Sequence, residues 1–152
     1  MKRFVAIFLF TCACTITHAQ VNFITTICGN GVAGYNGDGI PDVSAELNNP
    51  EGVCADPKGN LYIADDFNNR IRKINLTTGI ITTFAGTDSA GFSGDGGFAT
   101  NAKLFIPVDV FADTSGNVFI ADAENNRIRK VSVSTGIITT VAGNGVKLMF
   151  SI

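Results

Sequence analysis

The chain has 152 residues, of which 45% are hydrophobic and 16% charged, and its formal net charge is −2. This length is enough for one ordinary domain with a single hydrophobic core. The acidic balance disfavours nucleic acids and anionic membrane surfaces as partners, because binding to either draws much of its affinity from phosphate neutralisation by basic side chains.

The N-terminal segment at 1–19 has the pattern of a secretory signal peptide. Positions 1–3 supply positive charge, positions 4–10 are apolar, and positions 17–19 predict cleavage after Ala19. The apolar run is shorter than a membrane span requires, so we expect no stable membrane insertion, with a retained anchor as the alternative. Cleavage leaves nine basic against 13 acidic side chains, a net charge of −4, and removes the single histidine. We therefore expect a secreted protein, extracellular or periplasmic.

From position 24 onward the sequence is an internal repeat. Residues 24–80 laid on 81–137 are identical at 29 of 57 positions, with no insertion or deletion. Residues 138–146 begin a third copy, and residues 147–152 form an apolar tail that leaves the register. Such a period predicts units that bury their hydrophobic faces by stacking on one another.

Each repeat is predicted to form four short strands, because apolar runs alternate with turns rich in glycine and polar residues. Residues 23–28 come first and match the fourth strand of a unit. In the first full repeat the strands are expected at 52–56, 61–64, 70–76 and 80–85. Short turns join antiparallel neighbours. The expected fold class is therefore all-β, with two four-stranded antiparallel propeller blades plus one leading strand, a partial β-propeller over residues 23–146.

A long glycine-rich connection precedes the first strand of each blade, at residues 29–49 and 86–106. A short helical turn is predicted in each, at 41–47 and 98–104. Connections this long are uncommon in a tight repeat unless they cover or bind something. They carry the four residues predicted to contact a partner, which are Tyr35, Asp38, Phe92 and Asp95. In the alternative interpretation the aromatic rings seal the blades.

Asp38 and Asp95 each lie in a Gly-Asp-Gly segment that has a faint likeness to a calcium loop. The further acidic ligands of a good calcium site do not follow at the required spacing. We therefore expect these aspartates to shape turns, with calcium as the alternative, and we expect no metal site and no cofactor.

A second pair of aspartates ends the second strand of each blade, before Asn-Asn-Arg. A structural role is predicted, in which the carboxylate accepts turn N–H groups and pairs with the arginine that follows. The alternative makes these carboxylates ligands of a cation or a substrate. The residues of this structural motif are Asp65, Asn69, Arg70, Asp122, Asn126 and Arg127.

Short basic clusters follow the same motif, at residues 70–73 and 127–130. They have the charge to contact phosphate. On strands whose side chains alternate between two faces, we instead expect them on the solvated side of an edge, in agreement with the acidic net charge.

Two cysteines remain after cleavage, Cys28 and Cys54. The predicted fold places Cys28 on an outer fourth strand and Cys54 on an innermost first strand. Three inter-strand steps are about 14 Å, which exceeds the Cα separation that a disulfide allows. We therefore expect buried free thiols.

The motifs as a set resemble the NHL repeat. The residues that carry the resemblance are Ala64-Asp65 with Asn68–Lys73, preceded by Pro50, Gly52-Val53 and Gly59–Tyr62, and the insert Ala33–Gly39 is similar to the longer bacterial version of the repeat. The resemblance covers about residues 24–146. It implies a β-propeller, commonly of six blades, in a family whose members bind RNA or proteins or act as extracellular sensor modules, and with a few lyase or hydrolase relatives.

A six-bladed ring at this period would need about 340 residues. We therefore expect either a truncated or frame-shifted copy of a longer propeller or a short protein in which three chains build one ring. In both cases an open blade face invites self-association when the chain is expressed alone.

The function predicted from the sequence is that of a secreted binding or scaffolding module for a protein or glycan partner. Without a histidine after cleavage, a Ser-His-Asp triad or a histidine–zinc site cannot form within the chain. We therefore predict no catalytic residues and no enzyme activity. The alternative is a propeller enzyme, a lyase or a lactonase-like hydrolase, with catalytic residues elsewhere in a longer protein.

Overall fold

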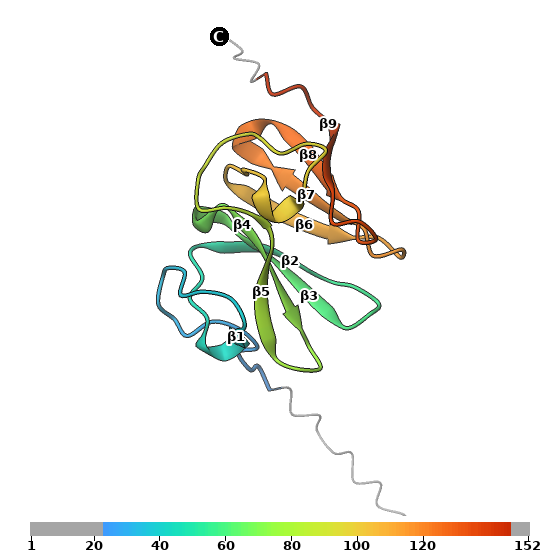
Figure 1. The fold of residues 1–152 in the computed structure, drawn as a ribbon. Coiled ribbons are helices and arrows are strands. Elements are labelled where there is room, and N and C mark those ends of the chain that lie inside the picture. Colours follow the sequence, from blue (N-terminus) through green and yellow to red (C-terminus); the bar gives the residue numbers. More distant parts are fainter. Residues whose placement is uncertain (1–22, 147–152) are drawn as a thin grey trace, which may run out of the picture.

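The computed structural model describes residues 23–146 (Figure 1). The predicted signal peptide at 1–19 and the predicted tail at 147–152 lie outside the described residues. Within the described part, the fold is all-β, and its helices are single 3₁₀ turns. No helix there is long and apolar enough to cross a membrane.

The first blade is a four-stranded meander that gains one short strand at its outer edge. Its strands are β2 (Pro50–Ala55), β3 (Asn60–Asp65), β4 (Arg70–Asn75) and β5 (Ile80–Gly86), and β1 (Ile40–Pro41) pairs with β5. All neighbours are antiparallel, in the order β1-β5-β4-β3-β2. The turn between β2 and β3 is closed by Asp56, whose carboxylate accepts the backbone N–H groups of Lys58 and Asn60.

The second blade repeats the meander in the order β6-β7-β8-β9. Its strands are β6 (Pro107–Ala112), β7 (Val118–Asp122), β8 (Arg127–Val131) and β9 (Ile138–Ala142). The expected pair of four-stranded antiparallel blades is thereby confirmed. The 3₁₀ turns are η1 (Asp42–Ser44), η2 (Asp66–Asn68), η3 (Ala99–Asn101) and η4 (Ala123–Asn125). Of these, η1 and η3 lie where the sequence predicted a short helical turn in each connection.

The predicted leading strand is not a strand in this structure. Residues 23–28 run outside every sheet of the described chain, and Ile24 is fully exposed. The physical reason is that a fourth strand hydrogen-bonds to the third strand of its own blade, and the described residues offer this segment no such neighbour. The extra strand of the first sheet is instead β1, through the register Ile40↔Ile81.

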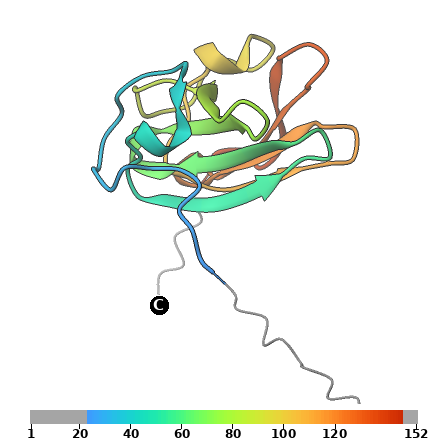
Figure 2. The ribbon, with the colours of Figure 1, turned by 90° about the horizontal axis from the view of Figure 1, so that it is seen from below.

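The main hydrophobic core lies between the two blades. Side chains of β3, β4 and β5, including Tyr62 and Ile71, pack against side chains of the second blade such as Val110 and Ile120, and all four are buried. Seen from below, the first blade lies in front of the second (Figure 2). A smaller core forms where the connection before β2 covers the other face of the first blade, around Ile63 and Ile74. The blades therefore stack face to face, as propeller blades do.

Candidate functional site

In each blade an aromatic ring from the long connection lies beneath two arginines of the third strand. The Cζ atoms of Arg70 and Arg72 are 4.0 and 4.7 Å from the centroid of the Tyr35 ring. The same arrangement recurs in the second blade, where two arginine Cζ atoms lie 3.7 and 4.8 Å from the Phe92 ring centroid. Positions two apart on a strand point to one face, so the Arg-x-Arg spacing delivers both guanidinium groups to the ring.

The inner arginine of each pair, Arg72 or Arg129, is completely buried. This corrects the prediction that residues 70–73 and 127–130 form the solvated side of an edge. The connection folds over this face of the sheet and supplies acceptors to the charge. Arg72 Nη2 donates to the Gly37 carbonyl at 2.8 Å and to Asp38 Oδ1 at 3.0 Å. Burial of a guanidinium group is tolerated because such acceptors replace its water.

Asp65 and Asp122 are buried at the ends of β3 and β7, and the backbone N–H groups that they accept come from the connections, not from the turn that was predicted. Asp65 accepts the Asn48 backbone N–H at 2.7 Å and the Asn68 side-chain amide at 2.9 Å. The prediction that these carboxylates pair with Arg70 or Arg127 is wrong: the ion-pair partners are Arg72, at 3.7 Å, and Arg129, at 3.2 Å.

Electrostatics at this motif are set first by burial. Desolvation raises the pKa of Asp65 and of Asp122, although hydrogen bonds and the neighbouring arginine act in the opposite direction. Each of these carboxylates holds a connection against the sheet through hydrogen bonds. Their oxygens are occupied by donors of the chain itself.

The remaining motif residues fix the turn between the second and third strands. Asn69 and Asn126 both have a φ of 51° and end η2 and η4 in the left-handed conformation, which asparagine tolerates better than most residues. Arg70 and Arg127 donate through Nη1 to the carbonyls of the residues two positions earlier, at 3.1 and 2.9 Å. The Asn-Asn-Arg motif is therefore explained by backbone geometry.

Asp38 and Asp95 hold the connections in place. Asp95 Oδ1 accepts from Arg129 Nη2 at 2.7 Å, and Asp38 Oδ1 accepts from Thr83 Oγ1 at 3.1 Å as well as from Arg72. Burial would raise the pKa of Asp95, but its hydrogen bonds and the charge of Arg129 keep the pKa below the ordinary value. No group of three or more histidine, cysteine or acidic side chains that could hold a metal lies within residues 23–146.

An open cleft of about 350 Å³ lies between the two connections, over β4 and β5 of the first blade. It is lined by Tyr35, Asp38, Arg70, Thr83, Gly86, Thr87, Asp88 and Thr100. Two of the four residues predicted to bind a partner, Tyr35 and Asp38, therefore share one cleft with a guanidinium group. Phe92 and Asp95 belong to the equivalent stack of the second blade.

The other six lining residues were not among those predicted to bind a partner, and three of them, Thr87, Asp88 and Thr100, lie in the second connection after its first glycine. A signal was nevertheless present in the repeat. These positions differ from their equivalents in the preceding repeat, which are Asn30, Gly31 and Val43, although the surrounding framework is shared. Loop positions that vary on a constant scaffold are where binding surfaces are usually built.

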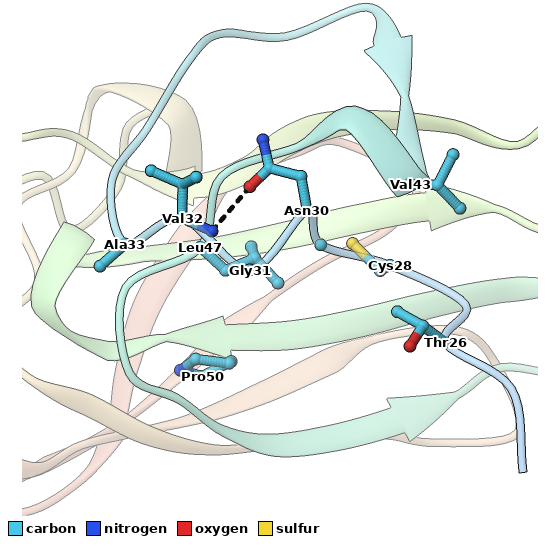
Figure 3. A pocket seen from close by; sticks show the side chains of 10 residues that line it. Thr26, Cys28, Asn30, Gly31, Val32, Ala33, Val43, Leu47 and Pro50 are labelled. Atoms are coloured by element: carbon cyan, nitrogen blue, oxygen red, sulfur yellow. Dashed lines mark hydrogen bonds between the residues drawn. The ribbon is translucent and has the colours of Figure 1, made fainter.

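A second, larger cavity of about 630 Å³ lies on the outer side of the first blade. Figure 3 shows Thr26, Cys28 and Val32 around it, with Val43, Leu47 and Pro50. The Asn30 side chain accepts the Val32 backbone N–H at 2.8 Å and shapes the segment that crosses it. Its walls are mainly apolar.

Cys28 and Cys54 are free thiols, as expected, but each is half-buried and not fully buried. Burial raises the pKa of both thiols. Cys28 lines the outer cavity, whereas Cys54 packs against the core between the blades. A raised pKa lowers the thiolate fraction and with it the reactivity of each sulfur.

Fold and repeat together define the class: the chain is a β-propeller-type protein made of stacked four-stranded blades. The NHL repeat model matches residues 47–74. The chain is 33% identical over 90 residues to protein SUPPRESSOR OF QUENCHING 1, chloroplastic, of Arabidopsis thaliana, covering 59% of this chain and 8% of that protein. It is 32% identical over 100 residues to NHL repeat-containing protein 2 of Bos taurus, covering 64% of this chain and 14% of that protein.

A solved structure has a similar fold. A structural genomics protein of unknown function from Bacteroides thetaiotaomicron VPI-5482 superimposes with a TM-score of 0.59 and 30% identity, over 68% of this chain and 26% of that one. The resemblance to the NHL repeat seen in the sequence is confirmed, with the match at residues 47–74. The chain spans no more than 14% of the length of the two curated relatives named above.

Proposed function

We propose that this chain is a secreted binding module whose contact surface is the cleft between the first and second connections. The observation that carries the proposal is the convergence of Tyr35, Asp38 and Arg70 on one open cleft of about 350 Å³. A cation, a carboxylate and an aromatic ring there face solvent together with threonine hydroxyl groups. This set suits a short polar segment of a protein partner.

Hydrogen bonds and ring contacts within the chain hold the first connection in place at the cleft. The Asn68 amide donates to the Gly34 carbonyl at 2.7 Å, and Asn36 accepts the Glu46 backbone N–H at 2.9 Å. The Tyr35 ring is clamped by two guanidinium groups but is still 36% exposed. Little conformational entropy is therefore lost when a partner binds.

A matched pair of substitutions tests the proposal. Thr87 lines the cleft, and Asn144 is its repeat equivalent on the second blade. The two side chains make the same local bond, since each accepts the backbone N–H two residues further on. Thr87→Lys and Asn144→Lys therefore remove the same local bond but place the new side chain in different surroundings.

The wild-type chain is used to select ligands from a random peptide display library and, in parallel, from a glycan array. We expect selected peptides to lose binding by about tenfold or more with Thr87→Lys. Asn144→Lys should bind as the wild type does. Failure to select any ligand, or equal losses in both variants, would contradict the proposal, and selection of glycans alone would replace the protein partner by a carbohydrate.

A further inference from the structure

Among the described residues, nothing covers one face of the second blade, whereas the counterpart of this face on the first blade is buried. On the first blade, the face against the second blade is formed by Cys54, Tyr62, Ala64, Ile71, Phe84 and Ala85. Their equivalents in the next repeat are Phe111, Phe119, Ala121, Ile128, Val141 and Ala142, which we call the open face.

Exposure separates the two faces clearly. Ile71 is 0% exposed and its equivalent Ile128 is 38% exposed. Phe111 and Val141 are 62% and 50% exposed. Two hollows, of about 280 and 150 Å³, are sunk into the open face, and Ala121 and Ile128 line both. Apolar side chains gathered in this way on one surface mark an interaction site.

The first blade has the complementary surface on its outer side. Val110, which covers the first blade within the chain, is 4% exposed, whereas its equivalent Val53 is 58% exposed. Pro107 is buried, whereas its equivalent Pro50 is exposed and lines the cavity of about 630 Å³. Within residues 23–146 the two blades therefore present both halves of the inter-blade interface, one on each blade.

We propose that the open face binds the outer side of the first blade of a second copy of this chain, head to tail. The occupant is indicated by the inter-blade interface inside the chain, where a face of the same composition is covered by a blade of the same sequence family. Such a contact is heterologous, so it builds a ring if the rotation closes and an open chain of molecules if it does not. It is separate from the polar cleft proposed to bind a partner.

Docking in this register requires the segment at residues 24–28 to move aside. Residues 24–32 and 138–146 are identical at seven of nine positions. Strand β9 of one copy would thus occupy the fourth-strand position that residues 24–28 of the next copy would otherwise take. The segment opposes this exchange weakly, because it belongs to no sheet within the described residues and Phe23 is 85% exposed.

One residue beside the open face, Asp109, fits this interface poorly. Gly52 packs against the second blade, and a Cβ atom there would lie 2.6 Å from Asp109 Cα. Asp109 is itself the repeat equivalent of Gly52. In the docked pair its side chain would therefore meet Gly52 of the second copy, and Asp109→Gly should relieve that contact.

The experiment is light scattering coupled to size exclusion over a concentration series. The wild-type chain should form discrete multiples of the protomer mass. Ile128→Glu should weaken association about tenfold or more, because it buries a charge in the interface. Asp109→Gly should strengthen association, a gain that non-specific hydrophobic contact does not predict.

Phe67→Glu serves as the matched control, since Phe67 is 58% exposed and its equivalent is Glu124. It removes an exposed aromatic side chain outside the open face and should associate as the wild type does. Circular dichroism checks that each variant is folded, and Phe111→Glu replaces Ile128→Glu if the latter is not.

Three outcomes overturn the proposal. One is a monomer at every concentration for both the wild type and Asp109→Gly. Another is a polydisperse aggregate that neither charge substitution in the open face affects. The third is association that Asp109→Gly leaves unchanged or weakens.

Discussion

Arg72 and Arg129 occupy the same position in the two blades, yet their guanidinium groups are satisfied differently. Arg129 binds Asp95 through Nε and Nη2, Asp122 through Nη1, and the Ser93 and Lys103 carbonyls as well. Arg72 donates through Nη2 alone, and its Nε and Nη1 atoms have no hydrogen-bond partner in the described chain. Two arginines at identical motif positions therefore make different numbers of hydrogen bonds, because the connections that cover them differ.

The largest expected effect tests this difference directly. Arg129→Met leaves Asp122 buried without its cation and should lower the free energy of unfolding by about 3–5 kcal/mol. Arg72→Met should cost less, because fewer hydrogen bonds are lost. Urea unfolding of both variants measures the two costs, and equal losses would show that the two blades hold their arginines equally well.

A glycine at the end of the fourth strand is buried in the first blade and exposed in the second. Gly86 is buried at a φ of 91°, and a Cβ atom there would meet the backbone of Asn69. Gly143 has the same conflict with Asn126, at a φ of 85°, but it is exposed. Gly86→Ala should cost about 3 kcal/mol, from left-handed strain with no room to relax.

Gly143→Ala should cost less, because the end of β9 is free to shift into solvent. Thermal unfolding of the two variants gives the comparison. A greater loss for Gly143→Ala would mean that the second blade is the more tightly packed of the two.

Much of the fold was accessible from the sequence because the repeat supplies its own alignment. Strand positions, blade order and the helical turns at η1 and η3 followed from apolar periodicity and turn residues that occur twice. That residues 23–28 form no strand could not be predicted in this way, because strand pairing depends on a neighbouring strand and not only on the segment's own residues. The burial of Arg72 was also missed, because alternation along a strand does not reveal a connection folding over its polar face.

The turn between the first two strands of each blade contains an aspartate, and the hydrogen bonds of this aspartate make the stability of the blade depend on pH. Asp56 accepts hydrogen bonds from Asn60 and from the Tyr62 hydroxyl, at 2.8 and 3.1 Å. Its counterpart Asp113 bonds to Asn117, but the equivalent of Tyr62 is Phe119, which has no hydroxyl. Burial would raise the pKa of Asp56, but these hydrogen bonds keep it below the ordinary value of 3.8. Asp56→Asn should therefore cost about 1–2 kcal/mol near neutral pH.

The sign of the pH dependence follows from the lowered pKa of the folded state. The stability that Asp56 contributes is present above the pKa of the unfolded chain and is lost as the pH falls through the lower folded pKa. The gap between wild type and Asp56→Asn should thus close on acidification below about pH 4. Denaturant unfolding at several pH values measures it, and a gap independent of pH would assign the loss to packing.

The smallest expected effect is a gain. Ile106 and its equivalent Asn49 share a φ of 54°, a left-handed conformation that a β-branched side chain adopts at a cost and asparagine adopts readily. The backbone N–H of Ile106 donates to the Asn69 side chain at 3.2 Å, a bond that substitution leaves in place. Ile106→Asn should therefore raise the free energy of unfolding by about 1 kcal/mol.

The reciprocal change, Asn49→Ile, should lower the free energy of unfolding by a similar amount, and both are read from the midpoint of urea unfolding. If Ile106→Asn instead destabilises the chain, the half-buried isoleucine side chain contributes more to packing between the blades than its backbone strain costs. Packing of the Ile106 side chain would then stabilise the second blade, whereas the first blade has Asn49 at the equivalent position and lacks this contact.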